Sequence, residues 1–194
     1  MIPVDPRQLA ALRADYARQG YVLLPRLVEP NVAAGWELRN RALPGKRVHV
    51  GYERQTKWLE QTFPQASQAL DGLAVAAELV NLVSQVAAIP TIDRRRTLVW
   101  INRYAPGDHV PTHCDGAGSA QFLLCLQELV DPEQGGDLHI REQAIPLRTG
   151  DAILFFARGV PHGTEPIHSP RVASSGFSRV TCVMRFFALE GASS

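Results

Sequence analysis

The second half of the chain consists of short apolar runs, most of them too brief for stable helices. Beyond Pro90 these runs alternate with clusters of Gly, Pro and Asp. Segments of this length that are bounded by turn-forming residues are typical of β-strands. The predicted strands span residues 97–104, 121–129, 137–140, 152–156 and 179–189. We therefore expect a compact all-β core in this half of the protein.

The first half has a helical character instead. Asp5 and Pro6 form a helix start signal, and apolar residues then recur at helical spacing until Gly20. A second start signal precedes Pro30, and residues 65–88 are rich in Ala, Leu and Val over a length that favours a helix. We therefore expect helices to precede the strands.

Helices followed by many short strands predict a mainly β fold, a double-stranded β-helix (jelly roll) core with N-terminal helices. A length of 194 residues fits one domain with a sizeable core. We expect a single domain over 1–194, with helical support over about 1–90 and the jelly-roll core over about 91–190.

The composition of the chain bears on its binding partners and on its cellular location. The chain is 45% hydrophobic and 20% charged, which is ordinary for a globular protein, and its net charge of +1 gives no broad electrostatic footprint for nucleic acid or an anionic membrane. No apolar run reaches the length of a membrane span and no N-terminal leader pattern is present. The three cysteines include no C-x-x-C pair, which fits a reducing compartment. We expect a cytoplasmic location, and the sequence predicts no oligomeric state.

A short polar motif follows Pro111 in the β-rich half. His113 and Asp115 are separated by one residue on a non-helical stretch, so their side chains can converge on one metal ion. The predicted strand at 152–156 leads to His162, a possible third ligand. Two histidines and one carboxylate form the facial triad of non-haem Fe(II) oxygenases, which leaves coordination positions open. Zinc accepts the same ligands, so a hydrolytic zinc site is the alternative.

The last predicted strand carries a second signal. By the two-residue period of a strand, Arg179, Thr181 and Arg185 share one face. Unpaired guanidinium groups on a half-buried strand are costly, so an anionic partner is implied, and a dicarboxylate offers the bidentate geometry that arginine prefers. An exposed strand face or an internal salt bridge would explain the same residues.

Taken in order, these motifs resemble the Fe(II)/2-oxoglutarate dioxygenases, particularly the AlkB branch, over roughly residues 98–187. The resemblance is carried by Ile-Asn-Arg-Tyr-Ala-Pro-Gly at 101–107, His113-x-Asp115, His162, and Arg179 with Arg185. The Gly-Gly strand at 134–140 and the Arg179-x-Thr181 pair resemble the prolyl-hydroxylase-like and small-molecule members instead.

The resemblance implies a role for each matching residue. It implies Fe(II) bound by His113, Asp115 and His162, and 2-oxoglutarate bound by Asn102, Tyr104, Arg179, Thr181 and Arg185. Arg179 would pair with the distal carboxylate and Arg185 would lie near the metal-bound carboxylate. The implied reaction consumes O₂ and 2-oxoglutarate, oxidises a substrate C–H bond and releases succinate and CO₂.

Three classes of function remain open at this stage. A small-molecule hydroxylase leads because the charge is balanced, an AlkB-like demethylase of alkylated nucleic acid is the alternative, and a non-oxidative metal-binding jelly-roll protein is the third. The poorly periodic stretch 45–63 is interpreted as a long surface loop or lid. We expect Arg54, Lys57 or Trp58 to contact the substrate there, with a plain surface loop as the alternative.

Overall fold

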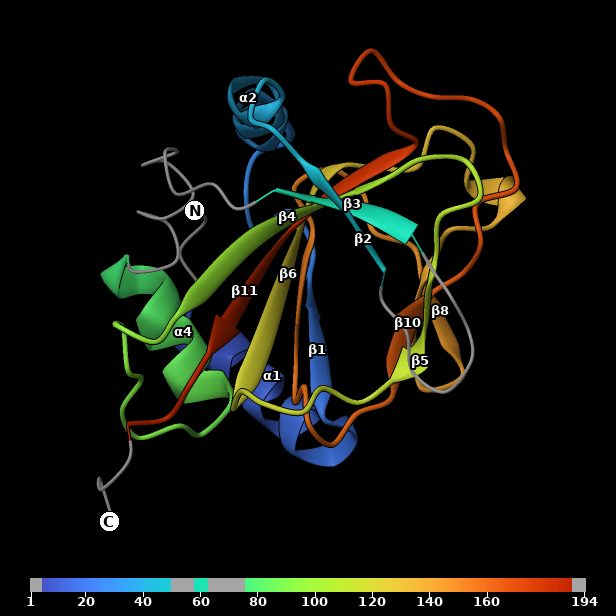
Figure 1. Ribbon diagram of the computed structural model, residues 1–194. Helices are drawn as coiled ribbons and strands as arrows, with labels where there is room; N and C mark the ends of the chain where they lie inside the picture. Colours follow the sequence, from blue (N-terminus) through green and yellow to red (C-terminus); the bar gives the residue numbers. More distant parts are fainter. Residues whose placement is uncertain (1–4, 50–57, 63–75, 190–194) are drawn as a thin grey trace.

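The computed structural model describes residues 5–49, 58–62 and 76–189, and it shows helices packed beside two β-sheets (Figure 1). The elements are α1 (Pro6–Gln19), β1 (Tyr21–Leu24), α2 (Pro30–Asn40), β2 (Lys46–His49), β3 (Trp58–Thr62), α4 (Ala77–Val86), β4 (Leu98–Tyr104), β5 (Val110–His113), β6 (Ala120–Gln127), the 3-10 turn η1 (Pro132–Gln134), β7 (Leu138–Ile140), β8 (Gln143–Ile145), β9 (Ala152–Phe155), β10 (His162–Thr164) and β11 (Arg179–Phe186). Within these ranges, no helix is long and apolar enough to cross a lipid bilayer.

The strands form a major and a minor sheet. The major sheet has seven strands in the order β1-β9-β6-β11-β4-β3-β2, and the minor sheet has four in the order β5-β10-β7-β8. Neighbouring strands are antiparallel throughout both sheets. This arrangement confirms the predicted mainly β fold with N-terminal helices.

The central strands of the major sheet are buried on both faces, and each face packs against a different layer. On β11, Val180, Cys182 and Met184 join the core that the helices cover, whereas Val183 joins the core between the two sheets. This alternation follows from the two-residue period of a strand. It puts Arg179 and Arg185 on one face of β11, as the sequence predicted, and this face lies on the side of the minor sheet.

The first helix begins and ends where its sequence signals lie. The Asp5 carboxylate accepts hydrogen bonds from the backbone N–H groups of Arg7 and Gln8, and the Gln8 side chain accepts one from the Asp5 N–H. This capping box satisfies donors that a helix N-terminus leaves open. At the other end Gly20 adopts a φ of 80°, and its N–H donates to the carbonyl of Tyr16. The turn delivers the chain directly into β1.

The interpretation of residues 45–63 as a loop is wrong at both ends. Lys46–His49 and Trp58–Thr62 form an antiparallel pair, and β3 continues the major sheet by pairing with β4. The hydrogen bonds of a sheet join backbone groups, so a polar sequence without apolar periodicity can still form an edge hairpin, and charged side chains suit an edge because they discourage further pairing. The remaining residues of this stretch lie outside the described ranges.

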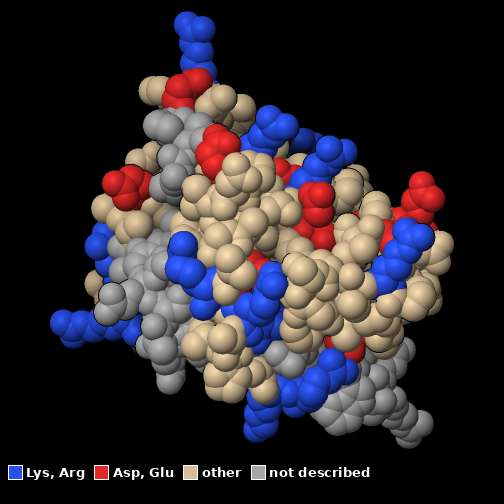
Figure 2. Space-filling model, turned by 90° about the horizontal axis from the view of Figure 1, so that it is seen from above, with Lys and Arg blue, Asp and Glu red and all other residues tan. Residues whose placement is uncertain are grey.

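Charges of both signs are present on the molecular surface. On the face drawn in Figure 2, basic side chains gather near the centre and acidic side chains lie close by. Some cations are paired: Arg41 contacts Glu37 at 2.6 Å, and Arg47 makes a two-pronged contact with Asp108 at 2.7 and 2.8 Å. Such pairs reduce the positive field that a polyanion would meet.

Candidate metal centre

Two of the three candidate ligands lie on neighbouring strands of the minor sheet, and the third follows one of these strands. His113 ends β5, His162 begins β10, and the two residues are directly paired across the strands. Asp115 follows two residues beyond β5, where its backbone N–H donates to the carbonyl of Ala157 at 2.9 Å. The pairing places the two imidazole ring centroids 4.4 Å apart, and the three potential ligand atoms all lie within 4.8 Å of one another.

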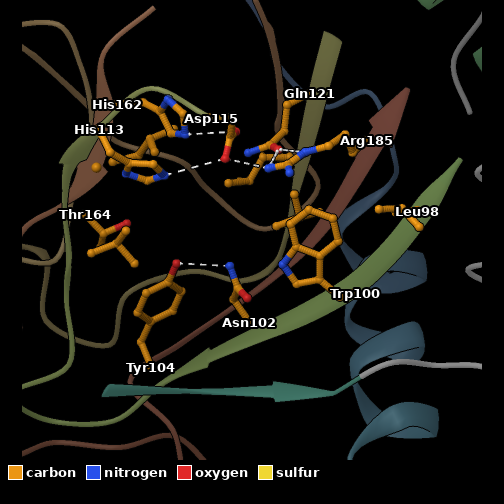
Figure 3. A pocket seen from close by; sticks show the side chains of 15 residues that line it. Leu98, Trp100, Asn102, Tyr104, His113, Asp115, Gln121, His162, Thr164 and Arg185 are labelled. Carbon is orange, nitrogen blue, oxygen red and sulfur yellow. Dashed lines mark hydrogen bonds and ion pairs between the residues drawn. The ribbon is translucent and has the colours of Figure 1, made fainter. Parts of the chain in front are cut away.

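Backbone carbonyls orient both imidazoles. Nδ1 of His113 lies 2.8 Å from the carbonyl oxygen of Pro111, and Nδ1 of His162 lies 2.9 Å from that of Val160. A carbonyl only accepts, so each Nδ1 carries a proton, and in the neutral ring Nε2 then offers a lone pair. The Nε2 atoms of His113 and His162 face Asp115 at 3.7 and 3.5 Å (Figure 3).

The carboxylate of Asp115 is ionised and incompletely satisfied. Burial alone would raise its pKa, but contacts with His113, His162 and Arg185 hold the pKa well below its usual value. Its Oδ2 is buried and has no hydrogen-bond partner among the described residues. At His113, burial lowers the pKa, whereas hydrogen bonds to Asp115 and Pro111 outweigh it and raise the pKa above its ordinary value.

These observations fit a divalent cation. A buried anionic oxygen without a donor is costly, and two imidazole lone pairs beside it complete a donor set that suits Fe(II). Three protein ligands leave coordination positions open for other ligands. His113, Asp115 and His162 are therefore the candidate facial triad that the sequence motif predicted.

A cavity of about 300 Å³ opens beside this triad (Figure 3). It is lined by Leu98, Trp100, Asn102, Tyr104, Val110, His113, Asp115, Gln121, Leu123, Leu138, His162, Gly163, Thr164, Val183 and Arg185. The lining thus combines apolar walls from both sheets with polar groups near the candidate ligands. Its size is at the lower end of the range typical of small-molecule sites.

The residues predicted to bind 2-oxoglutarate lie on β4 and β11, which pair antiparallel. Asn102 and Tyr104 line the cavity. Across the strand pair, Asn102 lies opposite Thr181, and Tyr104 lies opposite Arg179. Arg179 is only 2% exposed and does not itself line the cavity, and its guanidinium lies 5.3 Å from the ring centroid of Tyr104.

Arg179 is only partly satisfied inside the protein. Its Nη1 donates to the carbonyl of Gly136 at 2.5 Å, whereas Nε and Nη2 are buried without hydrogen-bond partners among the described residues. The hydroxyl of Thr181 is buried and unpartnered in the same way. Among the described residues, the internal salt bridge considered from the sequence is therefore not found at Arg179, and its two unpartnered nitrogens and the Thr181 hydroxyl are available to an anionic ligand.

Arg185 takes a different position from Arg179. Its Nη2 lies 2.6 Å from Oδ1 of Asp115, and its guanidinium also donates to Oε1 of Gln121. It is thus engaged with a candidate metal ligand, and a contact with 2-oxoglutarate stays a prediction.

The sequence analysis singled out neither Gln121 nor Trp100. Gln121 belongs to an apolar run and carries no motif. The position of Trp100 two residues before Asn102 on the same strand is a usable signal, because residues two apart share one face.

Most of the predicted substrate contacts in residues 45–63 lie outside the described residues. Arg54 and Lys57 lie outside the described residues. The structure includes Trp58 as the first residue of β3, but its side chain is likewise outside the described part. All three assignments stay predictions.

Comparison with known proteins supports the same chemistry. Residues 99–179 match the 2OG-Fe(II) oxygenase superfamily. No curated protein matches the sequence significantly. This matched segment contains the candidate triad together with Asn102, Tyr104 and Arg179.

Solved structures share the fold at low sequence identity. A non-haem α-ketoglutarate-dependent epimerase, SnoN, from nogalamycin biosynthesis has a TM-score of 0.73 and 16% identity over 95% of this chain and 82% of its own. A 2OG-Fe(II) oxygenase family oxidoreductase from Burkholderia pseudomallei gives 0.72 and 15% identity over 96% and 93% of the two chains. A prolyl-4-hydroxylase from Pseudomonas putida gives 0.69 and 18% identity over 93% and 99%.

The SnoN epimerase is also known in complex with Fe³⁺ and α-ketoglutarate. The two sets of donor groups described above suit these two ligands. The matched segment, the fold and the His-Asp-His cluster together point to an oxidoreductase of the 2OG-Fe(II) oxygenase type that depends on iron and 2-oxoglutarate.

Proposed function

We propose that the protein oxidises a C–H bond of a neutral small molecule, with 2-oxoglutarate and O₂ as co-substrates and succinate and CO₂ as by-products. The observation that carries this proposal is the triad at the wall of a cavity of about 300 Å³, with Oδ2 of Asp115 lacking a hydrogen-bond partner among the described residues. When bound, Fe(II) supplies the oxidising chemistry. The residues of the chain hold the metal, bind the co-substrate and shape the space for the substrate.

His113, Asp115 and His162 would hold the metal. Arg179 and Thr181 would bind the distal carboxylate of 2-oxoglutarate, because they offer buried donors without partners. A guanidinium offers a carboxylate two parallel hydrogen bonds, and burial strengthens them by excluding water.

The charge of the cavity favours a neutral substrate. Among the described lining residues, Arg185 is the only arginine or lysine, and it is paired with Asp115 at 2.6 Å. An anionic substrate would therefore find no free cation in this lining, whereas Leu98, Leu123 and Val183 offer apolar contact.

Trp100 supplies a specific polar feature in these walls. Its indole Nε1 is buried without a hydrogen-bond partner among the described residues. Figure 3 shows this nitrogen on the side of the ring that faces the middle of the cavity. Because a buried N–H without an acceptor is costly, we infer that the substrate carries a carbonyl or hydroxyl oxygen that accepts from it.

Small-molecule chemistry is also favoured over nucleic-acid repair. The similar SnoN structure is an epimerase from nogalamycin biosynthesis, and this chain has a net charge of only +1. A nucleic-acid demethylase depends on a basic footprint for most of its affinity.

The test is the formation of succinate from 2-oxoglutarate by the Fe(II)-loaded protein, with a panel of neutral oxygen-bearing metabolites and a methylated oligonucleotide. We expect succinate release to be stimulated by a member of the metabolite panel and not by the oligonucleotide. Stimulation by the oligonucleotide alone would overturn the small-molecule proposal. Absence of succinate under every condition would overturn the assigned reaction.

The Trp100 contact has its own comparison. Trp100→Phe keeps an aromatic ring and removes the N–H, so the KM for the stimulating metabolite should rise about tenfold, the effect of roughly 1.4 kcal/mol for one hydrogen bond. Trp36→Phe, a change on α2 away from the cavity, serves as the matched control. Equal KM values for the Trp100→Phe variant and this control would contradict the assignment.

A further inference from the structure

One guanidinium contacts a candidate metal ligand from the side opposite the histidines. Nη2 of Arg185 lies 2.6 Å from Oδ1 of Asp115, while Oδ2 of the same carboxylate is the oxygen nearer His162 and has no hydrogen-bond partner among the described residues. The two oxygens of Asp115 are therefore not equivalent. Oδ1 is engaged by a cation, and Oδ2 alone is left without a donor.

Arg185 is itself held by a residue with no assigned role. Gln121 on β6 is the direct cross-strand partner of Arg185 on β11. Its Oε1 accepts from Nε of Arg185 at 2.9 Å and from Nη2 at 2.7 Å. The same Nη2 thus bridges Gln121 and Asp115, and Gln121 is only 6% exposed.

Two further residues confine the arginine. The ring centroid of Trp100 lies 5.2 Å from the guanidinium carbon of Arg185, within the range of a cation–π contact. On another side a Cβ at Gly118 would lie 2.8 Å from Cγ of Arg185, so glycine leaves the space that the stem of Arg185 needs. Gly118 also has a φ of 97°, which glycine adopts without strain.

The identity of residue 121 matters for the charge balance. A glutamine holds Arg185 with a neutral acceptor, so the positive charge remains directed at Asp115. A glutamate in its place would compete for the same guanidinium.

We propose that Gln121 is a positioning residue that acts through Arg185. By fixing the guanidinium on Oδ1, it limits Asp115 to one free oxygen, Oδ2, for the metal. This inference rests on the metal site proposed above. Groups outside the ligand shell that orient metal ligands commonly change metal affinity by 10–100-fold when they are removed.

The experiment measures Co(II) affinity and the Co(II) d–d absorption spectrum of the full-length, metal-stripped protein. Gln121→Met removes the acceptor at similar volume, and Gln121→Asn keeps the amide but shortens its reach. We expect both variants to bind Co(II) about tenfold more weakly than the wild type. We also expect an altered d–d spectrum, because a released Arg185 lets Asp115 offer two oxygens.

Gln127→Met is the matched control. Gln127 ends the same strand, but its side chain donates to the carbonyl of Phe177 and accepts from the hydroxyl of Ser175 instead. We expect its Co(II) affinity and spectrum to equal those of the wild type. Thermal unfolding of each metal-free variant shows that loss of affinity is not loss of the fold.

A double-mutant cycle tests whether Gln121 acts through Arg185. In an Arg185→Met background, Gln121→Met should cause no further loss of Co(II) affinity, since the residue that it positions is gone. Wild-type affinity in both Gln121 variants, or multiplying losses in the double variant, would overturn the inference and leave the metal site intact. Absence of Co(II) binding by the wild-type protein would overturn the metal site as well.

Discussion

The nitrogen through which a histidine ligates a metal is decided by its hydrogen bonds. In both His113 and His162 a carbonyl two residues earlier fixes the proton on Nδ1, so Nε2 faces the cluster. The sequence predicted which three residues gather, because His113 and Asp115 are near neighbours and His162 follows a readable strand. It could not predict the ring orientation, which depends on backbone geometry.

Metal affinity should depend on pH through His113. In the metal-free protein its raised pKa means that the protonated ring stabilises the fold at pH values below its unfolded pKa, and that this contribution is lost as the pH rises through the folded pKa. The metal needs the unprotonated ring. Co(II) affinity should therefore increase with pH, by about tenfold per unit for one released proton, and level off above the pKa of His113.

Titrations of Co(II) at several pH values from about 6 to 8 measure this dependence. A His109→Ala variant, changed at a histidine outside the triad, should follow the wild-type curve. An affinity that does not change across this range would contradict a protonated His113 in the metal-free site.

Arg179→Ala should weaken 2-oxoglutarate binding strongly. The substitution leaves the buried distal carboxylate without its bidentate partner, and breaking such a pair costs about 2–5 kcal/mol. Arg179→Lys should restore only part of the affinity, because an ammonium group is a point charge and not a fork. The measurement is the concentration of 2-oxoglutarate that half-saturates succinate release. If the half-saturating concentration of 2-oxoglutarate is unchanged in Arg179→Ala and saturation is lost in Arg185→Ala, then Arg185 binds the distal carboxylate instead.

The strands that carry the ligands are the ones that the sequence predicted least well. The strands β4, β6, β9 and β11 were predicted within a few residues, because they are rich in apolar and β-branched residues and are bounded by turn-forming clusters. The short strands β5, β8 and β10 have three or four residues, mixed in character, and were missed. Their pairing across the minor sheet, and not local propensity, makes them strands.

The β5–β10 pair should be sensitive to a single methyl group. A Cβ at Gly163 would lie 2.8 Å from the carbonyl oxygen of Val110 and 2.9 Å from the backbone N of Thr112. Gly163→Ala therefore pushes β5 away from β10 and separates His113 from His162. Overpacking of this kind costs about 1–3 kcal/mol of stability, and we expect weaker Co(II) binding as well.

Thermal unfolding and Co(II) titration of Gly163→Ala measure both effects. Gly35→Ala is the control, because its Cβ would meet only the flexible end of Arg39 at 3.8 Å and a helical Gly→Ala change is neutral or stabilising. Wild-type stability and Co(II) affinity in Gly163→Ala would show that neither property depends on the close approach of β5 and β10 at this glycine.

At the scale of the whole molecule, the N-terminal helices and the major sheet share one apolar core. Leu79 and Val83 of α4 belong to the same buried cluster as Phe122 and Met184 of the sheet. This continuity supports the proposal that residues 1–194 form a single domain, which predicts one cooperative transition in calorimetry. Two separated transitions would instead indicate that the N-terminal helices and the jelly-roll core unfold as separate units.

The central claim is that His113, Asp115 and His162 hold the iron on which turnover depends. The most direct test compares the wild type with Asp115→Ala by anaerobic Fe(II) titration, followed by succinate formation from 2-oxoglutarate in air. The wild type should bind one Fe(II) per chain and form succinate. Asp115→Ala should retain the fold by circular dichroism and lose both properties together, since it removes one of only three ligands. Full Fe(II) binding and full succinate formation in folded Asp115→Ala would contradict the assignment of the metal centre.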